Sequence, residues 1–240
     1  LVCVACAQRC KLADGARGVC LMRSRGGDAL RVPWGYVAGL AVDPIEKKPF
    51  FHFIPGARAL SFGMLGCDLH CPFCQNWLSS QTMRDPRARE RVVPIAPAAL
   101  VAAAIENACA VITSTYNEPL ITAEWSHDVF ALAHAAGVRT AFVSNGQATR
   151  EVIDYLAPVL DAFKVDLKAF RTETYRALGG HLEAVKETIV ALHGRGLWVE
   201  VVTLVVPGMN DSDTELAASA AFLAGVSPDL PWHLTAFHPD

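Results

Sequence analysis

The chain has 240 residues, of which 52% are hydrophobic and 19% are charged, and its formal net charge is -3. A chain of this length can bury one large core. The weak negative charge gives no reason to expect a nucleic-acid partner. No apolar run approaches the roughly 20 residues that a membrane span requires. Eight cysteines without a signal peptide in view indicate metal chemistry in a reducing compartment, so we expect a cytoplasmic protein.

The predicted elements divide the chain into two parts. Residues 1–58 hold four cysteines and little periodicity, which indicates a small cysteine-rich metal-binding extension and a loop segment packed on the main domain. Residues 59–240 alternate apolar runs typical of strands with amphipathic stretches typical of helices. Strands are expected at residues 59–65, 110–115, 139–144, 161–168, 198–206 and 232–237. Helices are expected at residues 96–108, 119–136, 148–157, 181–194 and 212–224.

This alternation predicts the fold class. Strands that alternate with helices pair in parallel and are joined by crossover helices. We therefore expect an α/β fold, a partial (β/α)6 TIM-like barrel preceded by the small cysteine-rich extension. In such barrels the chemistry lies at the C-terminal ends of the strands. Polar motifs follow or end each of the expected strands, in agreement with that rule.

Three cysteines follow the first expected strand. Cys67, Cys71 and Cys74 have the spacing C-x3-C-x2-C, which can hold three irons of a [4Fe-4S] cluster. The run has no fourth cysteine, so one iron would stay open to a small molecule, like the open position of a catalytic zinc site. The alternative is a zinc knuckle or a fully ligated cluster, with His70 or Cys109 as the fourth ligand.

The fourth expected strand carries three charges on one face. Lys164, Asp166 and Lys168 share that face because side chains alternate along a strand. Charges that point into a barrel are costly unless they are paired or bind a ligand. We therefore predict a site for a charged cofactor. The alternative is an ion pair between these side chains at the barrel mouth.

Other polar residues at strand ends are weaker candidates. Glu118 can accept hydrogen bonds from a ligand or compensate the N-terminus of the following helix. Asn145 can bind a polar ligand from a turn, and His238 can be functional or structural. Ser212 and Glu215 predict a capping box at the start of a helix.

The N-terminal cysteines form a second group. Cys3, Cys6, Cys10 and Cys20 have the spacing C-x2-C-x3-C-x9-C. Four thiolates at this spacing suit a closed zinc site and equally an auxiliary [4Fe-4S] cluster. The sequence leaves both metals open, with a small preference for zinc.

With these motifs, the chain resembles the radical S-adenosylmethionine (SAM) enzymes. It is similar to the radical SAM member of the AmmeMemoRadiSam system, a relative of the pyruvate formate-lyase activating enzymes. The resemblance rests on the four N-terminal cysteines, residues 43–49, His52, residues 66–76, residues 115–119, residues 165–168, Glu200, residues 207–211 and residues 232–240.

The resemblance implies a cluster on the C-x3-C-x2-C cysteines, with SAM on the open iron and Asp166, Lys168 and His238 around it. One electron would then break a sulfonium S–C bond and give a 5'-deoxyadenosyl radical that abstracts a hydrogen. Implied partners are SAM, a reductant such as a flavodoxin or ferredoxin, and the co-occurring AmmeMemoRadiSam proteins. The family's sequences continue beyond Asp240, so we expect a truncated C-terminus.

The resemblance leaves the target of the radical open. One alternative is a small molecule or a partner protein, and another is a glycyl-radical enzyme for which the chain is the activase. The N-terminal cysteines and Lys47-Lys48 are not features of the simple activases, which disfavours direct activation of pyruvate formate-lyase. An alternative interpretation places the chain in another functional class, as a non-catalytic zinc or iron-sulfur electron-transfer module.

Overall fold

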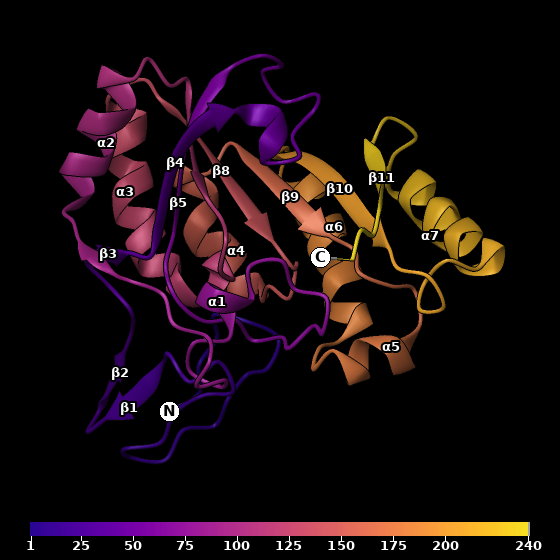
Figure 1. The fold of residues 1–240 in the computed structure, drawn as a ribbon, viewed down its shortest axis with the longest axis horizontal. Coiled ribbons are helices and arrows are strands. Elements are labelled where there is room, and N and C mark those ends of the chain that lie inside the picture. The colour runs from indigo at the N-terminus through magenta and orange to yellow at the C-terminus, as the bar shows by residue number, and fades with distance from the viewer. Residues whose placement is uncertain (240) are drawn as a thin grey trace.

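The computed structural model describes residues 1–239 and contains one large sheet (Figure 1). Its strand order is β11-β10-β9-β8-β7-β5-β4, in which β4 is antiparallel to β5 and all other neighbours are parallel. The strands are β4 (Gly39–Pro44), β5 (Arg58–Gly63), β7 (Val111–Ser114), β8 (Arg139–Ser144), β9 (Ala162–Asp166), β10 (Trp198–Val205) and β11 (Trp232–Ala236). The prediction of an α/β fold with parallel strands is confirmed.

Helices connect the parallel strands. The crossover helices are α2 (Pro97–Glu106), α3 (Ala123–Ala135), α4 (Arg150–Leu156), α6 (Leu182–Gly194) and α7 (Asp213–Val226). Shorter elements are α1 (Trp77–Ser80), α5 (Thr172–Ala177), η1 (Ile45–Lys47), η2 (Pro119–Thr122) and η3 (Ala157–Val159). Two small antiparallel pairs join β1 (Ser24–Gly26) to β2 (Ala29–Arg31) and β3 (Tyr36–Val37) to β6 (Val93–Pro94). Among residues 1–239, no helix has the length and apolarity that a membrane span needs.

The predicted helix start at residue 212 is confirmed in part. Ser212 caps α7, because its hydroxyl accepts a hydrogen bond from the backbone N–H of Glu215 at 3.3 Å. The Glu215 carboxylate instead accepts a hydrogen bond from the N–H of Phe170 at 2.6 Å and pairs with Arg171 at 3.0 Å. The prediction of a capping box is therefore wrong for Glu215. Its carboxylate bonds instead to Phe170 and Arg171 in the loop that follows β9.

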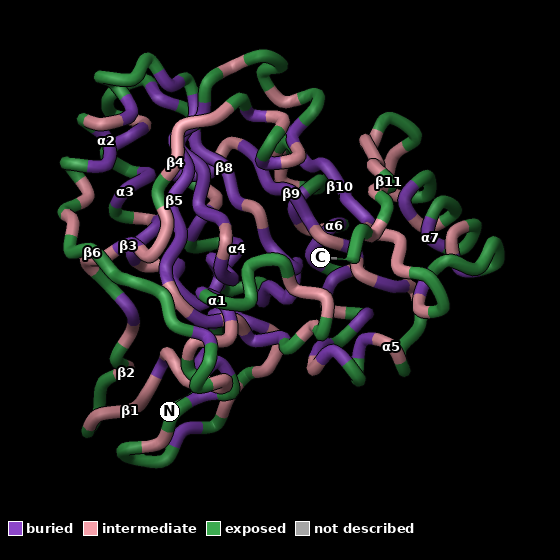
Figure 2. The backbone as a smooth tube through the Cα atoms, viewed as in Figure 1, coloured by how far each residue is buried: buried purple, intermediate pink, exposed green. Residues whose placement is uncertain are grey.

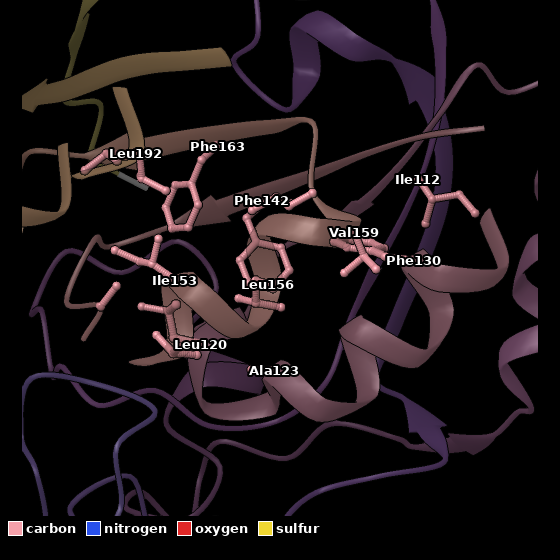
Figure 3. Packing of buried hydrophobic residues seen from close by; sticks show 14 of the residues in the cluster. Ile112, Leu120, Ala123, Phe130, Phe142, Ile153, Leu156, Val159, Phe163 and Leu192 are labelled. Carbon is pink, nitrogen blue, oxygen red and sulfur yellow. The ribbon is translucent and has the colours of Figure 1, made fainter. Parts of the chain in front are cut away.

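The main core lies between the helices and one face of the sheet. Phe142 and Phe163, on neighbouring strands, are buried with ring centroids 5.7 Å apart, and Phe130 of α3 meets Phe142 at 5.5 Å (Figure 3). Each such side chain contributes about 1.5–3 kcal/mol by burial. Figure 2 shows the central strands buried along most of their length. The predicted alternation along β9 is confirmed, since Val165 belongs to this helix-side core.

The opposite face of the sheet carries a second, smaller core at the N-terminal ends of the strands. Residues 45–57, which we call the plug segment, connect β4 to β5 and place Ile45 and Phe50 against the sheet. Small side chains receive them, such as Ala141 and Ala162. In Figure 1 the plug segment lies at the tails of the strand arrows, on the far side from α1.

Residues 1–23 lie at the other end of the sheet, below α1 in Figure 1. The buried Arg23 guanidinium donates two hydrogen bonds to Glu124 of α3, at 2.6 and 2.7 Å. The N–H of Ala7 donates to the carbonyl of Gln147 at 2.7 Å. The cysteine-rich segment is therefore attached to the loops that follow the strands.

Two predictions about organisation are not decided by this arrangement. Within residues 1–239 the two outer strands β4 and β11 do not pair with each other, so the partial barrel stays a prediction. The division at residue 58 also stays a prediction. The sequence did not predict β4, which lies before that division and pairs with β5 along its whole length. Residue 240 lies outside the described residues.

Candidate functional site

A cavity of about 490 Å³ lies at the C-terminal ends of the strands. Its wall is built by segments that are far apart in the sequence: the loop after β5, the ends of β7, β8 and β9, and the plug segment. The predicted site residues that line it are Cys67, Cys71, Cys74, Glu118, Asn145, Asp166 and Lys168. The structure therefore gathers these predicted residues in one place.

The C-x3-C-x2-C cysteines lie on the loop between β5 and α1, and all three are half-buried and free. The backbone N–H of Leu69 points at the Cys67 sulfur at 3.4 Å, and the Cys74 sulfur lies 3.3 Å from the Ser80 hydroxyl. Burial raises the pKa of the Cys67 thiol and of the Cys71 thiol. A bound metal is the usual means of keeping such buried sulfurs deprotonated.

His70 does not complete a compact ion site with these cysteines. Its side chain is exposed and lies against Gly179. Among residues 1–239, the only three metal-ligating atoms within 4.8 Å of one another belong to His52, Glu200 and His233. In the described residues, the sulfur atoms of the cysteines are therefore too far apart to bind one ion together. A zinc knuckle would require them to lie close together.

Asp68 lies inside the cysteine motif, and the sequence analysis assigned it no role. Its carboxylate is fully buried beside Cys67, and one oxygen accepts a 2.7 Å hydrogen bond from the Asn145 amide. The other oxygen has no partner among the described residues. Burial raises the pKa of Asp68, while the hydrogen bond from Asn145 opposes that shift. Asp68 thus lies beside Cys67 and is bonded to Asn145, and only its position inside the motif could have indicated this.

Glu118 is held by the backbone around it. Its Oε1 accepts from the N–H of Leu120 at 3.0 Å and from the Ser144 hydroxyl at 2.7 Å, and its Oε2 accepts from the N–H of Asn145 at 2.8 Å. The first of these bonds caps η2, so the predicted helix-terminal role is realised. Burial, and next the negative charge of Asp68, raise the pKa of Glu118 to about 8.

The three charges of β9 lie where alternation predicts. Lys164 is buried and bonds to Asp166, and the Lys168 ammonium lies 3.4 Å from the other Asp166 oxygen. Burial alone would raise the pKa of Asp166, but the two lysines outweigh it and the pKa is lowered. Burial would lower the pKa of Lys168, but Asp166 outweighs it and the pKa is raised. The predicted ion pair exists, and it also lines the cavity.

His238 is not among the side chains that line the cavity. It follows β11, is exposed, and its predicted place beside SAM stays a prediction. Cys109 is buried just before β7 and is not among the residues that line the cavity, as its apolar surroundings predict.

Lys48 and Tyr116 form a further wall of the cavity that the sequence reasoning did not assign. The buried Lys48 ammonium donates to the Tyr116 hydroxyl at 3.0 Å and to Asp43 at 3.1 Å. Tyr116 has a φ of 70°, which is uncommon for a residue with a side chain. Gly63 makes this conformation possible, because a Cβ there would lie 2.6 Å from the Thr115 carbonyl.

The N-terminal cysteines lie close to this site but are not drawn together around one ion. Cys3, Cys6 and Cys20 are buried, and Cys10 is half-buried. Burial raises the pKa of Cys6 and of Cys20, and their neighbouring acid Asp68 adds to both shifts. The extension therefore brings a second set of buried thiols to the edge of the cavity-forming loop.

A family model decides the identity of this arrangement. The model described as the radical SAM superfamily matches residues 63–221, which include the cysteine loop and β7 to β10. The chain belongs to the radical SAM superfamily. This radical SAM chain is therefore an enzyme that cleaves SAM and uses radical chemistry.

Relatives agree with this membership. An uncharacterized protein of Methanocaldococcus jannaschii is 35% identical over 240 residues, which cover 99% of this chain and 71% of that protein. The benzylsuccinate synthase activating enzyme of Thauera aromatica is 25% identical over 114 residues, 47% of this chain and 34% of that enzyme. The second of these relatives is an activating enzyme, and neither of them identifies the substrate of this chain.

Two solved structures share the fold of this radical SAM chain. SuiB of Streptococcus suis bound to its precursor peptide SuiA has a TM-score of 0.56 at 12% identity, covering 81% of this chain and 42% of SuiB. TYW1 with a lysine-pyruvate adduct bound has a TM-score of 0.54 at 18% identity, covering 80% of this chain and 69% of TYW1. At these identities the likeness concerns the fold alone.

The superfamily implies a [4Fe-4S] cluster and SAM, and the residues present fit both. Three half-buried thiols lie on one loop at the cavity, which is the donor set that an iron-sulfur cluster needs. The cavity also presents a carboxylate and ammonium groups, which suit the ammonium and carboxylate of SAM. Its volume of about 490 Å³ is in the range of cofactor pockets.

Proposed function

We propose that Cys67, Cys71 and Cys74 hold the cluster and that SAM lies between them and the end of β9. The observation that carries this proposal is that the three cysteines and the Lys164-Asp166-Lys168 set line the same cavity. When bound, the cluster and SAM supply a 5'-deoxyadenosyl radical that abstracts a hydrogen from a small molecule or a partner protein.

The side chains of β9 supply the charges that orient SAM. The Asp166 side chain is 30% exposed and that of Lys168 is 19% exposed, so both keep a free edge toward the cavity. Asp166 accepts hydrogen bonds from the ammonium or the ribose hydroxyls, and Lys168 donates to the carboxylate. Lys164 is only 4% exposed and acts by holding Asp166 in place.

Glu118 and Asn145 form the wall on the side of Cys67. Three bonds occupy the Glu118 carboxylate, and Oε2 carries only one of them. Its second lone pair is free to accept a hydrogen bond from the SAM ammonium. Asn145 faces Cys67 at 3.8 Å and holds Asp68, so it sets the position of the loop that carries the cysteines.

SAM binding to the anaerobically reconstituted protein tests these roles. We expect Asp166→Asn to weaken binding about tenfold or more, because it removes a charge-assisted hydrogen bond worth about 1.5–3 kcal/mol. The matched control is Asp154→Asn, which removes an exposed partner of Arg195. SAM should also perturb the electron paramagnetic resonance spectrum of the reduced cluster. Equal affinities in both variants would contradict the assignment of Asp166.

A partial barrel is the architecture that we infer for residues 59–240. The buried hydrophobic residues of α2, α3, α4, α6 and α7 belong to one core on one face of the sheet. The other face carries the cavity and the plug segment. A sheet with helices on one face and a ligand site on the other is typical of barrels rather than of doubly wound folds.

The N-terminal cysteines are the ligands that we propose for a second metal, zinc or an auxiliary [4Fe-4S] cluster. Burial of these thiols is the supporting observation, because a metal would offset the cost that burial imposes on thiolates. Cys3→Ala separates the two metals. Reduced folding yield indicates a structural ion, whereas normal yield with lost turnover indicates an auxiliary cluster.

We further infer membership of the AmmeMemoRadiSam system, with its co-occurring proteins and a flavodoxin or ferredoxin as partners in the cytoplasm. Activation of a glycyl-radical enzyme is a second candidate function. It is favoured by the similarity to the benzylsuccinate synthase activating enzyme over 114 residues. Hydrogen abstraction from a backbone glycine would leave a radical signal on the co-purified target enzyme, and abstraction from a small molecule would not.

A further inference from the structure

Three side chains meet at the end of the sheet opposite to the cysteine loop. The Glu200 carboxylate is fully buried near the start of β10, and its Oε2 lies 2.7 Å from His233 Nε2 of β11. His52 Nδ1, from the plug segment, lies 3.5 Å from the same oxygen. The two imidazole rings are stacked, with centroids 5.4 Å apart and an angle of 21° between their planes.

This group is separate from the cysteine cavity. None of its three members lines that cavity, although Glu200 shares the inner face of β10 with Val202 and Leu204, which do. Glu200 lies at the third residue of β10, toward the N-terminal end, and pairs in register with Lys164. The group is therefore below the floor of the cavity, where the plug segment meets the sheet.

The surroundings of Glu200 hold its carboxylate in a fixed orientation. Oε1 accepts hydrogen bonds from the N–H groups of His52 at 3.0 Å and Phe53 at 2.9 Å, and from the Trp198 indole at 3.0 Å. Oε2 accepts from the N–H of Phe51 at 3.0 Å. Partners of this kind orient the ligands of metal sites. Oε2 is also the oxygen that both imidazole rings approach.

The distances suit a tetrahedral ion. Zinc bonds of about 2.0–2.1 Å to nitrogen and oxygen place neighbouring ligand atoms roughly 3.4 Å apart. The two measured separations, 2.7 and 3.5 Å, lie on either side of this value, and all three atoms lie within 4.8 Å of one another. Two imidazoles and one carboxylate are a donor set that zinc uses with one open position. The His52 side chain is 57% exposed, so solvent reaches the group from the side of His52.

We propose that His52 Nδ1, His233 Nε2 and Glu200 Oε2 bind a zinc ion that fastens the plug segment to β10 and β11. Binding replaces the hydrogen bond between His233 and Glu200. The His233 imidazole stays neutral: its ring proton resides on Nδ1, exchanged through solvent, and the lone pair of Nε2 binds the metal. No electron is transferred. The ion joins segments about 150 residues apart along the chain, and such a link stabilises the folded state by restricting the unfolded one.

The number of zinc ions bound at equilibrium tests the proposal in the full chain. Free cysteine thiols are also zinc ligands in general, so the informative quantity is the difference in bound zinc between variants. We expect His52→Ala to bind one equivalent less than the wild-type chain, because the exposed imidazole can be removed without disturbing the bonds that Glu200 makes to the backbone. His193→Ala, which removes an exposed histidine at the end of α6, should bind as many ions as the wild type.

Two further measurements make the result decisive. His233→Ala should lose the same single equivalent, and circular dichroism reports whether each variant is folded. With cobalt as the probe, the wild-type spectrum minus that of His52→Ala should show d–d bands without thiolate charge transfer. Equal zinc stoichiometry in the wild type and folded His52→Ala would overturn the proposal and leave Glu200 as an anchor for the plug segment alone. A difference spectrum with thiolate charge transfer would also overturn it.

Discussion

Asn145 donates a 2.7 Å hydrogen bond to the buried carboxylate of Asp68 and thereby joins the end of β8 to the loop that carries Cys67, Cys71 and Cys74. The same residue accepts the N–H of Gln147 at 2.9 Å through its side-chain oxygen. Both ends of the amide are thus occupied. The geometry of the cysteine loop therefore depends on a strand that is 77 residues away in the sequence.

Asn145→Ala should destabilise the metal-free protein by about 1–3 kcal/mol, because it leaves a buried carboxylate without its partner. Urea unfolding under anaerobic conditions measures this free energy. Asn107→Ala is the matched control, since the Asn107 amide bonds to a backbone carbonyl at an exposed position. If Asn145→Ala lowers the free energy of unfolding no more than Asn107→Ala does, the hydrogen bond from Asn145 to Asp68 does not stabilise the protein as described.

Glu118 should make the stability of the metal-free protein fall as the pH rises. Its pKa is about 8 in the folded state against about 4.5 unfolded, so the folded chain binds one more proton between these values. The wild type should therefore lose about 1.4 kcal/mol per pH unit over this window, relative to Glu118→Gln. Above pH 8 the difference should become constant. Parallel stability curves for the two proteins between pH 5 and 8 would argue against the raised pKa.

Asp161 should make the stability of the protein fall as the pH is lowered, which is opposite to the effect of Glu118. Its carboxylate accepts hydrogen bonds from His134, Arg139 and the N–H of Thr140, and these partners outweigh burial and lower its pKa. The stabilisation is complete above the unfolded pKa of about 3.9 and is lost as the pH falls through the folded value. Asp161→Asn should cost about 1–3 kcal/mol at pH 7.

Thermal unfolding between pH 7 and 3 measures this loss of stability. The difference in stability between the wild type and Asp161→Asn should disappear at the acidic end of this range. Asp154→Asn is the control, because its exposed pair with Arg195 is worth about 0–1 kcal/mol. A gap for Asp161→Asn that stays the same at every pH would show that the carboxylate charge is not the cause.

Gly63→Ala should displace the segment that carries Tyr116. The new Cβ would lie 2.6 Å from a backbone carbonyl and 2.7 Å from the Tyr116 Cβ, so the chain must move at a cost of about 1–3 kcal/mol. Gly194→Ala is the matched control within α6, where no atom lies within 4 Å of the added methyl group. That change should stabilise the protein by about 0.5–1 kcal/mol. Thermal melts that rank the two variants in the reverse order would contradict the packing described at Gly63.

The parallel strands could be predicted because they are buried on both faces or alternate strongly, as β9 does between Lys164 and Asp166 on one side and Val165 on the other. The cysteine motif could be predicted because its spacing is local. β4 could not, since its half-exposed residues carry no clear period and its pairing with β5 is set by the plug segment between them.

The parts of the site that the sequence did not indicate depend on long-range contacts. Asp68 obtains its role from Asn145, and Glu200 obtains its role from three backbone N–H groups about 150 residues earlier. Nothing in the local sequence of either residue shows these partners. His238 illustrates the reverse case, since its strand-end position was predicted but its side chain is exposed.

The most direct test of the account is whether the reconstituted protein, given dithionite and SAM under anaerobic conditions, produces 5'-deoxyadenosine. Chromatography of the reaction mixture measures the product. We expect the wild type and Cys109→Ala to form it and Cys71→Ala to form none, because Cys71 lies at the cavity and Cys109 is buried away from it. Equal production by Cys71→Ala, or none by a wild-type protein that holds its cluster and binds SAM, would contradict the account.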